Sequence, residues 1–294
     1  MKVIFCIALS LISISLFAQE TIMVTVDSST ASVAQHTFSV DIPQTTIKDV
    51  KNDWQKHVAS GNKGKASFVN EEYIQTGVVN KNISPDPFTM YSKLMETPVG
   101  VRLTARLELN YLASSSGVAN SNQDLAVQKF LQDFAIDQYR TAVKKELNIE
   151  QKKLASLEKD LSKGIKEEEK STKNMKENDR SNERSEDAIS TNNRDINNST
   201  DKISDQKGMV NVTASDPNAT KGAKKTLAEL KREKRSLQKQ NESQSKKIDN
   251  RNKENREEDR NIQLAQQNNE TLKVAIERQK AVVEVVQVKL NNIQ

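Results

Sequence analysis

The C-terminal part of the chain carries a regular pattern of apolar and asparagine residues. In the segment NESQSKKIDNRNKENREEDRNIQLAQQNNETLKVAI, residues 241–276, asparagine and isoleucine alternate at intervals of seven residues. This series extends from Leu227 to Leu290, and a second series follows it three residues later. Such spacing is typical of a helix that packs against another helix. The pattern therefore predicts a long helix over residues 220–293.

An earlier segment has the same periodicity. One series takes every seventh residue from Leu147 to Val210, and a companion series three residues later runs from Leu157 to Gln206. The companion consists mostly of glycine, serine and asparagine, and it contains no charged residue although the surrounding segment is highly charged. We therefore expect another long helix over residues 122–211, with a seam of small polar side chains.

A short segment, residues 212–219, separates the two predicted helices. It contains Asp-Pro-Asn, and proline disfavours helix at the residue before it, so we expect a hairpin turn. If the bend lies between Asp216 and Pro217, residues equally far from it face each other. The facing pairs then match: Leu157 with Ile276, Leu161 with Leu272, Asn178 with Asn255, and Asn192 with Asn241. We predict an antiparallel coiled-coil hairpin within one molecule, although the pattern could also serve pairing between molecules.

Some predicted layers of the hairpin are polar. Buried asparagine pairs weaken a coiled coil but penalise shifted registers, in which asparagine would face leucine. Three layers lack a complementary pair in this alignment: Glu168 with Ala265, Met175 with Glu258, and Asn182 with Arg251. We expect the hairpin to be loosest at these three layers.

The first part of the chain has the two-residue period of β-strands. Strands are predicted at residues 21–26, 36–42, 66–69, 73–79, 88–95 and 99–110. The last of these alternates apolar and polar residues throughout, which is typical of an antiparallel sheet with one buried and one wet face. Apolar residues at helical spacing predict a helix over residues 46–59, which Thr46 and Asp49 can cap.

These elements predict an α+β fold class. A small head domain over residues 19–115 has an antiparallel sheet with one packed helix, and a long antiparallel α-helical coiled-coil hairpin follows it. Trp54 and all four tyrosines lie at or before Tyr139, so the core is expected in the first half. The hydrophobic fraction of 35% and the aromatic fraction of 4% are too low for one compact core built from 294 residues.

Residues 1–18, MKVIFCIALSLISISLFA, have the pattern of a secretory signal peptide. Lys2 precedes a short apolar run that ends with the small Ala18 before Gln19. The alternative, a membrane anchor, requires about 20 apolar residues, and serines interrupt this run. We expect cleavage after Ala18, export to the periplasm or the extracellular space, and no membrane span in the mature chain.

The sequence offers few residues for chemistry. The single cysteine, Cys6, lies in the predicted signal peptide, so disulfides and thiolate chemistry are not expected in the mature chain. His36 and His57 are the only histidines, and the many carboxylates show no catalytic or metal-binding spacing. We therefore predict no catalytic residue, no metal site and no cofactor, and the protein is not expected to be an enzyme.

The formal net charge is +5, with basic and acidic residues interspersed along the predicted helices. Interspersed charge is typical of a solvated helix surface and is weak evidence for an anionic partner. The sequence has no basic patch interleaved with aromatic residues, so nucleic acid is not an expected partner.

Several segments together resemble a family of exported proteins of unknown function from Bacteroidetes-type bacteria. The resemblance lies in a signal ending in LFAQ, in KDVKNDWQKHV and VRLTARLEL, and in FLQDFAIDQYR before the charged helices. It implies a location in the cell envelope and transfers no catalytic residue.

The predicted function is that of a non-enzymatic exported envelope protein. Its head would dock to one or more protein partners, and its coiled-coil arm would act as a spacer or interaction scaffold; a homo-oligomer is compatible with the pattern. One alternative is a periplasmic holdase chaperone similar to the Skp chaperones, which use basic helical arms on a small β body and cradle clients only as oligomers. Another is an adaptor resembling membrane-fusion proteins, which also use helical hairpins.

Overall fold

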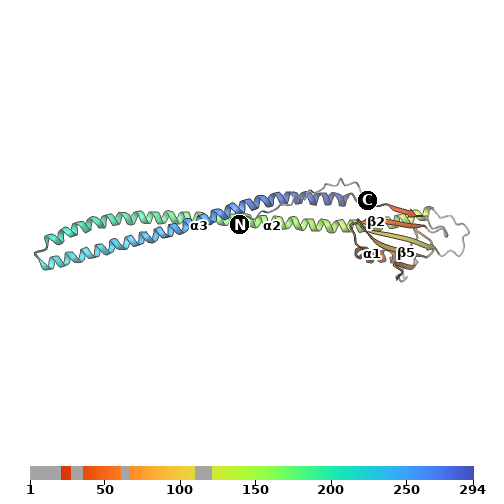
Figure 1. Ribbon diagram of the computed structural model, residues 1–294, viewed down its shortest axis with the longest axis horizontal. Coiled ribbons are helices and arrows are strands. Elements are labelled where there is room, and N and C mark those ends of the chain that lie inside the picture. The colour runs from red at the N-terminus through yellow and green to blue at the C-terminus, as the bar shows by residue number, and fades with distance from the viewer. Residues whose placement is uncertain (1–20, 28–35, 61–65, 110–120) are drawn as a thin grey trace. The chain divides into compact units, whose positions relative to one another are not determined.

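The computed structural model describes residues 21–27, 36–60, 66–109 and 121–294 (Figure 1). The predicted signal peptide, residues 1–18, lies outside the described residues. The elements are β1 (Val24–Asp27), β2 (Thr37–Pro43), α1 (Ile47–Ala59), β3 (Ala66–Val69), β4 (Glu72–Val78), β5 (Phe88–Thr97), β6 (Gly100–Leu109), α2 (Ser121–Val212) and α3 (Pro217–Asn291).

The chain divides into two compact units, and each is described by itself. The head unit contains Met1–Leu154 together with Arg278–Gln294, and the hairpin unit contains Ala155–Glu277. The predicted head, residues 19–115, lies within the head unit. That unit also includes the beginning of α2 and the end of α3.

The strands of the head form one antiparallel sheet in the order β1-β2-β6-β5-β4-β3. Strands β5 and β6 pair along their whole length, and β2 pairs with the other side of β6. Within the ladder, Val40 lies beside Leu103 and Leu103 lies beside Leu94, so apolar residues line up across one face. The predicted antiparallel sheet, followed by two long packed helices, is confirmed.

One face of this sheet is buried under α1 and the first turns of α2. Val50, Trp54 and Val58 point from α1 into the core, and α2 contributes a row that includes Phe134 and Tyr139. Trp54 is 1% exposed, and its buried indole N–H donates to Ser92 Oγ over 2.8 Å, which satisfies the one polar atom of the side chain. The aromatic start of α2 thus belongs to the head core.

The two long helices pack against each other as an antiparallel hairpin, as predicted. Every position of the two seven-residue series on α2, and of the two on α3, is buried or half-buried. The predicted asparagine layers form: Asn178 Nδ2 donates to Asn255 Oδ1 over 3.0 Å, and Asn192 Nδ2 donates to Asn241 Oδ1 over 2.9 Å. The register deduced from a bend between Asp216 and Pro217 is therefore the register of the structure.

The helix ends at the turn differ from the predicted ones. The first long helix spans Ser121–Val212, and the second begins at Pro217 instead of residue 220. The carboxylate of Asp216 accepts hydrogen bonds from the backbone amides of Asn218 and Ala219 at 2.9 and 3.3 Å. Asp216 thus caps α3, and Pro217 occupies the first helical position, where its missing amide costs nothing.

One of the three layers expected to lack a complementary pair has one, since Asn182 and Arg251 bond each other; the looseness of the three layers stays a prediction. Arg251 Nη1 donates to the Ser181 carbonyl, Asn182 Oδ1 and Ser185 Oγ at 2.9, 3.2 and 3.1 Å. Asn182 and Ser185 are both buried. An arginine that meets only neutral acceptors has its donors satisfied without a carboxylate, so this layer is bonded and not empty.

In the other two layers, the hydrogen bonds join residues that lie diagonally across the helix pair. Glu168 accepts from Gln266 Nε2 at 2.9 Å and from Asn269 Nδ2 at 3.2 Å, and Glu258 accepts from Asn174 Nδ2 at 2.9 Å. Long polar side chains reach residues beside the one that faces them. Pairing by facing positions alone misses such contacts.

The packing at Gly164 predicts a specific effect of mutation. A Cβ atom on Gly164 would collide with the amide of Asn269, which is 4% exposed, whereas a Cβ atom on Gly208 would meet nothing within 4 Å. Alanine is a better helix former than glycine by about 1 kcal/mol. We expect Gly208→Ala to stabilise the protein by up to about that amount, and Gly164→Ala to destabilise it by roughly 1–3 kcal/mol, in denaturation followed by circular dichroism. Equal stabilisation by both substitutions would contradict the packing of Asn269 against Gly164.

Candidate functional site

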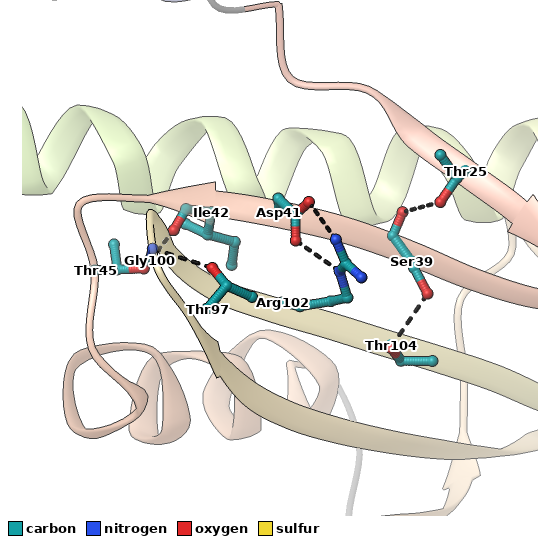
Figure 2. Close-up of polar contacts among 9 residues, drawn as sticks. All are labelled: Thr25, Ser39, Asp41, Ile42, Thr45, Thr97, Gly100, Arg102 and Thr104. Atoms are coloured by element: carbon teal, nitrogen blue, oxygen red, sulfur yellow. Dashed lines mark hydrogen bonds and ion pairs between the residues drawn. The ribbon is translucent and has the colours of Figure 1, made fainter.

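The sheet face opposite α1 carries an ordered array of polar side chains, which we call the open face. Figure 2 shows part of it, where β1, β2 and β6 lie side by side. Asp41 and Arg102 are cross-strand neighbours, and Arg102 donates from Nε and Nη2 to the two carboxylate oxygens, both over 2.8 Å (Figure 2). Ser39 Oγ lies 3.2 Å from Thr104 Oγ1 on the same face.

The array continues across β5 and β4. Arg106 donates from Nη2 to Glu72 Oε2 over 3.1 Å, and its guanidinium lies 3.8 Å from the ring centroid of Tyr91. The Tyr91 hydroxyl donates to Glu108 Oε2 over 2.6 Å. An arginine stacked on an aromatic ring and bonded to a carboxylate is held in one orientation. The open face therefore presents fixed charges and hydroxyls instead of mobile ones.

The charges of the open face are set by these contacts. The hydrogen bond from Arg102 lowers the pKa of the Asp41 carboxyl, and the same bond raises the pKa of Arg102. The hydrogen bond to Glu108 raises the pKa of Tyr91. Asp41 is thus ionised and Tyr91 is protonated at neutral pH, so neither is prepared to exchange a proton there. The arrangement is suited to recognition of a polar surface.

His36 lies in the head beside the start of α2. Its Nδ1 is 2.7 Å from Asp124 Oδ2, and Asp124 stands in the first turn of α2. Both side chains are about one quarter exposed. The pair joins the segment before β2 to the N-terminus of α2, where a carboxylate is also favoured by the helix dipole. The structure therefore gives His36 a role in holding these two elements together.

His57 lies between α1 and α2 in an aromatic cluster. Its ring stacks on Phe130 with centroids 4.4 Å apart, and Trp54 lies 6.0 Å from His57 and 5.9 Å from Phe130. Its Nε2 atom is buried without a hydrogen-bond partner. Burial lowers the pKa of His57, and the backbone of Phe130 and the carboxylates of Asp137 and Asp133 oppose that effect. His57 is thus a packing residue in which the neutral form is favoured.

A cleft of about 320 Å³ opens between the turn before α1 and α2. Its lining includes Gln44, Thr45, Asp49, Lys145 and Ile149. Lys145 Nζ lies 3.0 Å from Asp49 Oδ1. The hydrogen bond from Thr46 and then that from Lys145 lower the pKa of Asp49. The cleft contains a satisfied ion pair that connects α1 to α2, so the open face remains the better candidate for recognition.

Among the residues that the structure describes, no group of three or more histidine, cysteine, aspartate or glutamate side chains is arranged to hold a metal ion. Within the same residues, no helix is both long and apolar enough to cross a membrane.

The sequence predicted that the open face would be wet, but it did not identify the pairs on it. Asp41 and Arg102 are far apart in the chain and meet only because β2 lies next to β6. Alternation of apolar and polar residues assigns a residue to a face and cannot assign its neighbour on the next strand. No protein-family model matches the chain, and a search of curated proteins finds no similar protein.

The environment of His57 predicts how stability depends on pH. Its pKa is lower in the folded state than the usual value of about 6.5. The unfolded chain therefore binds more protons as the pH falls below about 6.5, and the free energy of unfolding decreases. We expect His57→Phe to weaken this decrease between pH 7.5 and 5, and to stabilise the protein at pH 7 by about 1 kcal/mol because the unpaired nitrogen is removed. Thermal unfolding of the parent protein and of His57→Phe at a series of pH values measures both effects. His36 is present in both proteins, so it cancels in the comparison. Identical pH profiles for the two proteins would contradict this account.

Proposed function

We propose that this protein is a non-enzymatic exported envelope protein, in which the open face of the head binds a protein partner and the hairpin acts as a spacer or interaction scaffold. The observation that carries the proposal is the series of hydrogen-bonded polar layers between α2 and α3. Asn178 with Asn255, Asn192 with Asn241, and Arg251 with its three acceptors are bonded in one register. Such layers reduce stability relative to leucine and specify alignment, which is what an arm of defined length requires.

The head supports the same proposal because both long helices contribute residues to it. Gln132 Nε2 donates to the Ile22 carbonyl over 2.8 Å, and Arg140 Nη2 donates to the Ile293 carbonyl over 3.0 Å. Val143 from α2 and Val286 from α3 are both buried in the head core. Both long helices thus contribute side chains to the head core. Shared packing of this kind suits the part of a scaffold from which an arm continues.

The proposed location is the periplasm or the extracellular space. It is supported by the signal-like pattern of residues 1–18 and by the resemblance to exported Bacteroidetes-type proteins. Both supports come from the sequence. Fractionation of cells that produce the full chain tests the location directly, and a protein found only in the cytoplasm would contradict it.

A holdase chaperone is the second candidate, and one observation favours it. Three valines on α3, at Val274, Val285 and Val288, are 52%, 40% and 50% exposed. Exposed apolar side chains on a helix offer contact surface that unfolded chains can bind when such residues gather into a patch. Sedimentation of the full chain separates the candidates: a monomer that fails to suppress aggregation of an unfolded outer-membrane protein excludes the holdase.

The hairpin component of the proposal is tested by cross-linking. Leu161→Cys and Leu272→Cys, placed in a chain that carries Cys6→Ser, should form a cross-link within one molecule, because these half-buried residues face each other in the observed register. As a matched control, Leu161→Cys with Leu264→Cys should not close, since Leu264 is 58% exposed. The products are distinguished by gel mobility and by mass. Cross-links found only between molecules would show that the arm pairs in trans.

The recognition component is tested by a charge swap on the open face. Asp41→Arg with Arg102→Asp keeps an ion pair of the same kind, so the fold should be retained while the charge pattern changes. We expect the swapped protein to capture at least tenfold less partner from an envelope fraction, corresponding to about 1.4 kcal/mol of binding energy. The matched control swaps Lys129 and Asp133, an exposed pair on α2. Equal capture by both variants and the parent would place the recognition surface elsewhere.

A further inference from the structure

The outward side of α3 in the hairpin unit carries a line of cations. These positions repeat every seven residues on the side of α3 that points away from α2, and five of the six lie five residues after a member of the first series, from Leu227 to Asn255. They are Lys225, Arg232, Lys239, Lys246, Lys253 and Arg260, and all are exposed. We call these six residues the basic ridge. Seven residues rise by about 10.5 Å, so the cations repeat at that interval along one side of the helix.

The side chains of the basic ridge form no ion pair or side-chain hydrogen bond among the described residues. Acids stand three or four residues from them, at Glu229, Glu242, Asp249 and Glu257, but none is within ion-pair distance of a ridge cation. On α2, by contrast, Lys163 lies 3.0 Å from Asp160 and Lys173 lies 3.8 Å from Glu177. The ridge is therefore a row of solvated positive charges that an anionic partner can pair with.

The residues between the cations are suited to a hydroxylated partner. Four residues after Arg232, Lys239 and Lys246 stand Ser236, Ser243 and Asn250, which are exposed and uncharged. They lie on the same side of the helix as the cations and can donate and accept hydrogen bonds. Glu242 and Asp249 lie along one flank of the ridge. The other flank carries Glu229 and Glu257 at its two ends, and between them it carries only these three uncharged residues.

The cationic pattern is not a general property of this side of α3. The same stripe continues after Arg260 with Gln267 and Val274, and Val274 is 52% exposed. Solvent exposure alone thus does not dictate lysine or arginine at these positions. The six consecutive cations form a bounded segment with a defined beginning and end.

We propose that the basic ridge binds a linear anionic polysaccharide. A chain with one carboxylate per disaccharide repeats its charge at an interval close to that of the ridge, and its hydroxyls match the serine and asparagine side chains. Duplex nucleic acid carries one charge per about 1.7 Å, far denser than the ridge. Single strands are bound through aromatic stacking, and no aromatic residue follows Tyr139. The proposal goes beyond the proposed function and does not rest on it, because it concerns α3 and not the open face.

The experiment measures binding of a fluorescein-labelled hyaluronate oligosaccharide, which carries one carboxylate per disaccharide, to the full chain by fluorescence anisotropy at several salt concentrations. The ridge variant carries Lys239→Gln, Lys246→Gln and Lys253→Gln. We expect its affinity to be at least about tenfold lower, since three contacts are lost, and its salt dependence to be weaker. Glutamine has a helix propensity close to that of lysine, so the melting temperature should be unchanged.

The matched control carries Lys224→Gln, Lys231→Gln and Lys247→Gln, which remove the same charge from exposed positions off the ridge on the same helix. Its affinity should stay within about twofold of the parent, because only net charge has changed. Three results would overturn the proposal: no binding at physiological salt, equal losses in the two variants, or tighter binding of a single-stranded DNA of matched charge. The last would identify nucleic acid as the partner.

Discussion

The alignment of α2 against α3 is the constraint that organises the longer part of this chain. In the interface, aliphatic positions such as Leu161 and Ile203 are interrupted by layers of asparagine, serine or glycine. The polar layers lower the stability of the helix pair and increase the specificity of its alignment. Asn269 illustrates the principle, because its side chain is accommodated only by the missing Cβ of Gly164. A shift of one heptad can place Asn178 against Ile262 and Asn192 against Ile248 and so leave their amides without partners, which is costly inside a helix pair. The observed register is thus favoured because shifted registers lose these hydrogen bonds and cost free energy.

The head is stabilised in a different way. It concentrates the aromatic residues, and Trp54 shares its core with β5 through Ser92 and with α2 through Phe134. Residues from α1, the sheet, the start of α2 and the end of α3 belong to one apolar cluster. The most stable part of the protein is therefore expected where all these elements meet, and local opening is expected to be easier where polar layers replace apolar ones.

The outer surfaces divide the protein into regions of different chemistry. On the open face of the head, Asp41 with Arg102 and Glu72 with Arg106 neutralise each other and fix their side chains in place. On the basic ridge of α3, the cations have no such partners. A paired surface favours recognition by shape and hydrogen bonding, whereas an unpaired one attracts mobile anions over a distance set by salt. These differences make two separate binding surfaces on one chain physically reasonable.

The sequence by itself determined the fold class, the strands and the helical hairpin with its register, because period-two and period-seven patterns are local and the central Asp-Pro turn fixes which residues face each other. It did not determine the diagonal contacts of Arg251 and Glu168, since long polar side chains choose among several neighbours. Nor did it determine the ion pairs of the open face, because strand order brings together residues distant in the chain. The basic ridge was not identified from the sequence, because basic and acidic residues are interspersed along it. The orientation of α3 against α2 decides which of its cations lie on the outward side of the helix. Periodic patterns can be identified from the sequence, whereas contacts between side chains on neighbouring strands or helices form only when the chain folds.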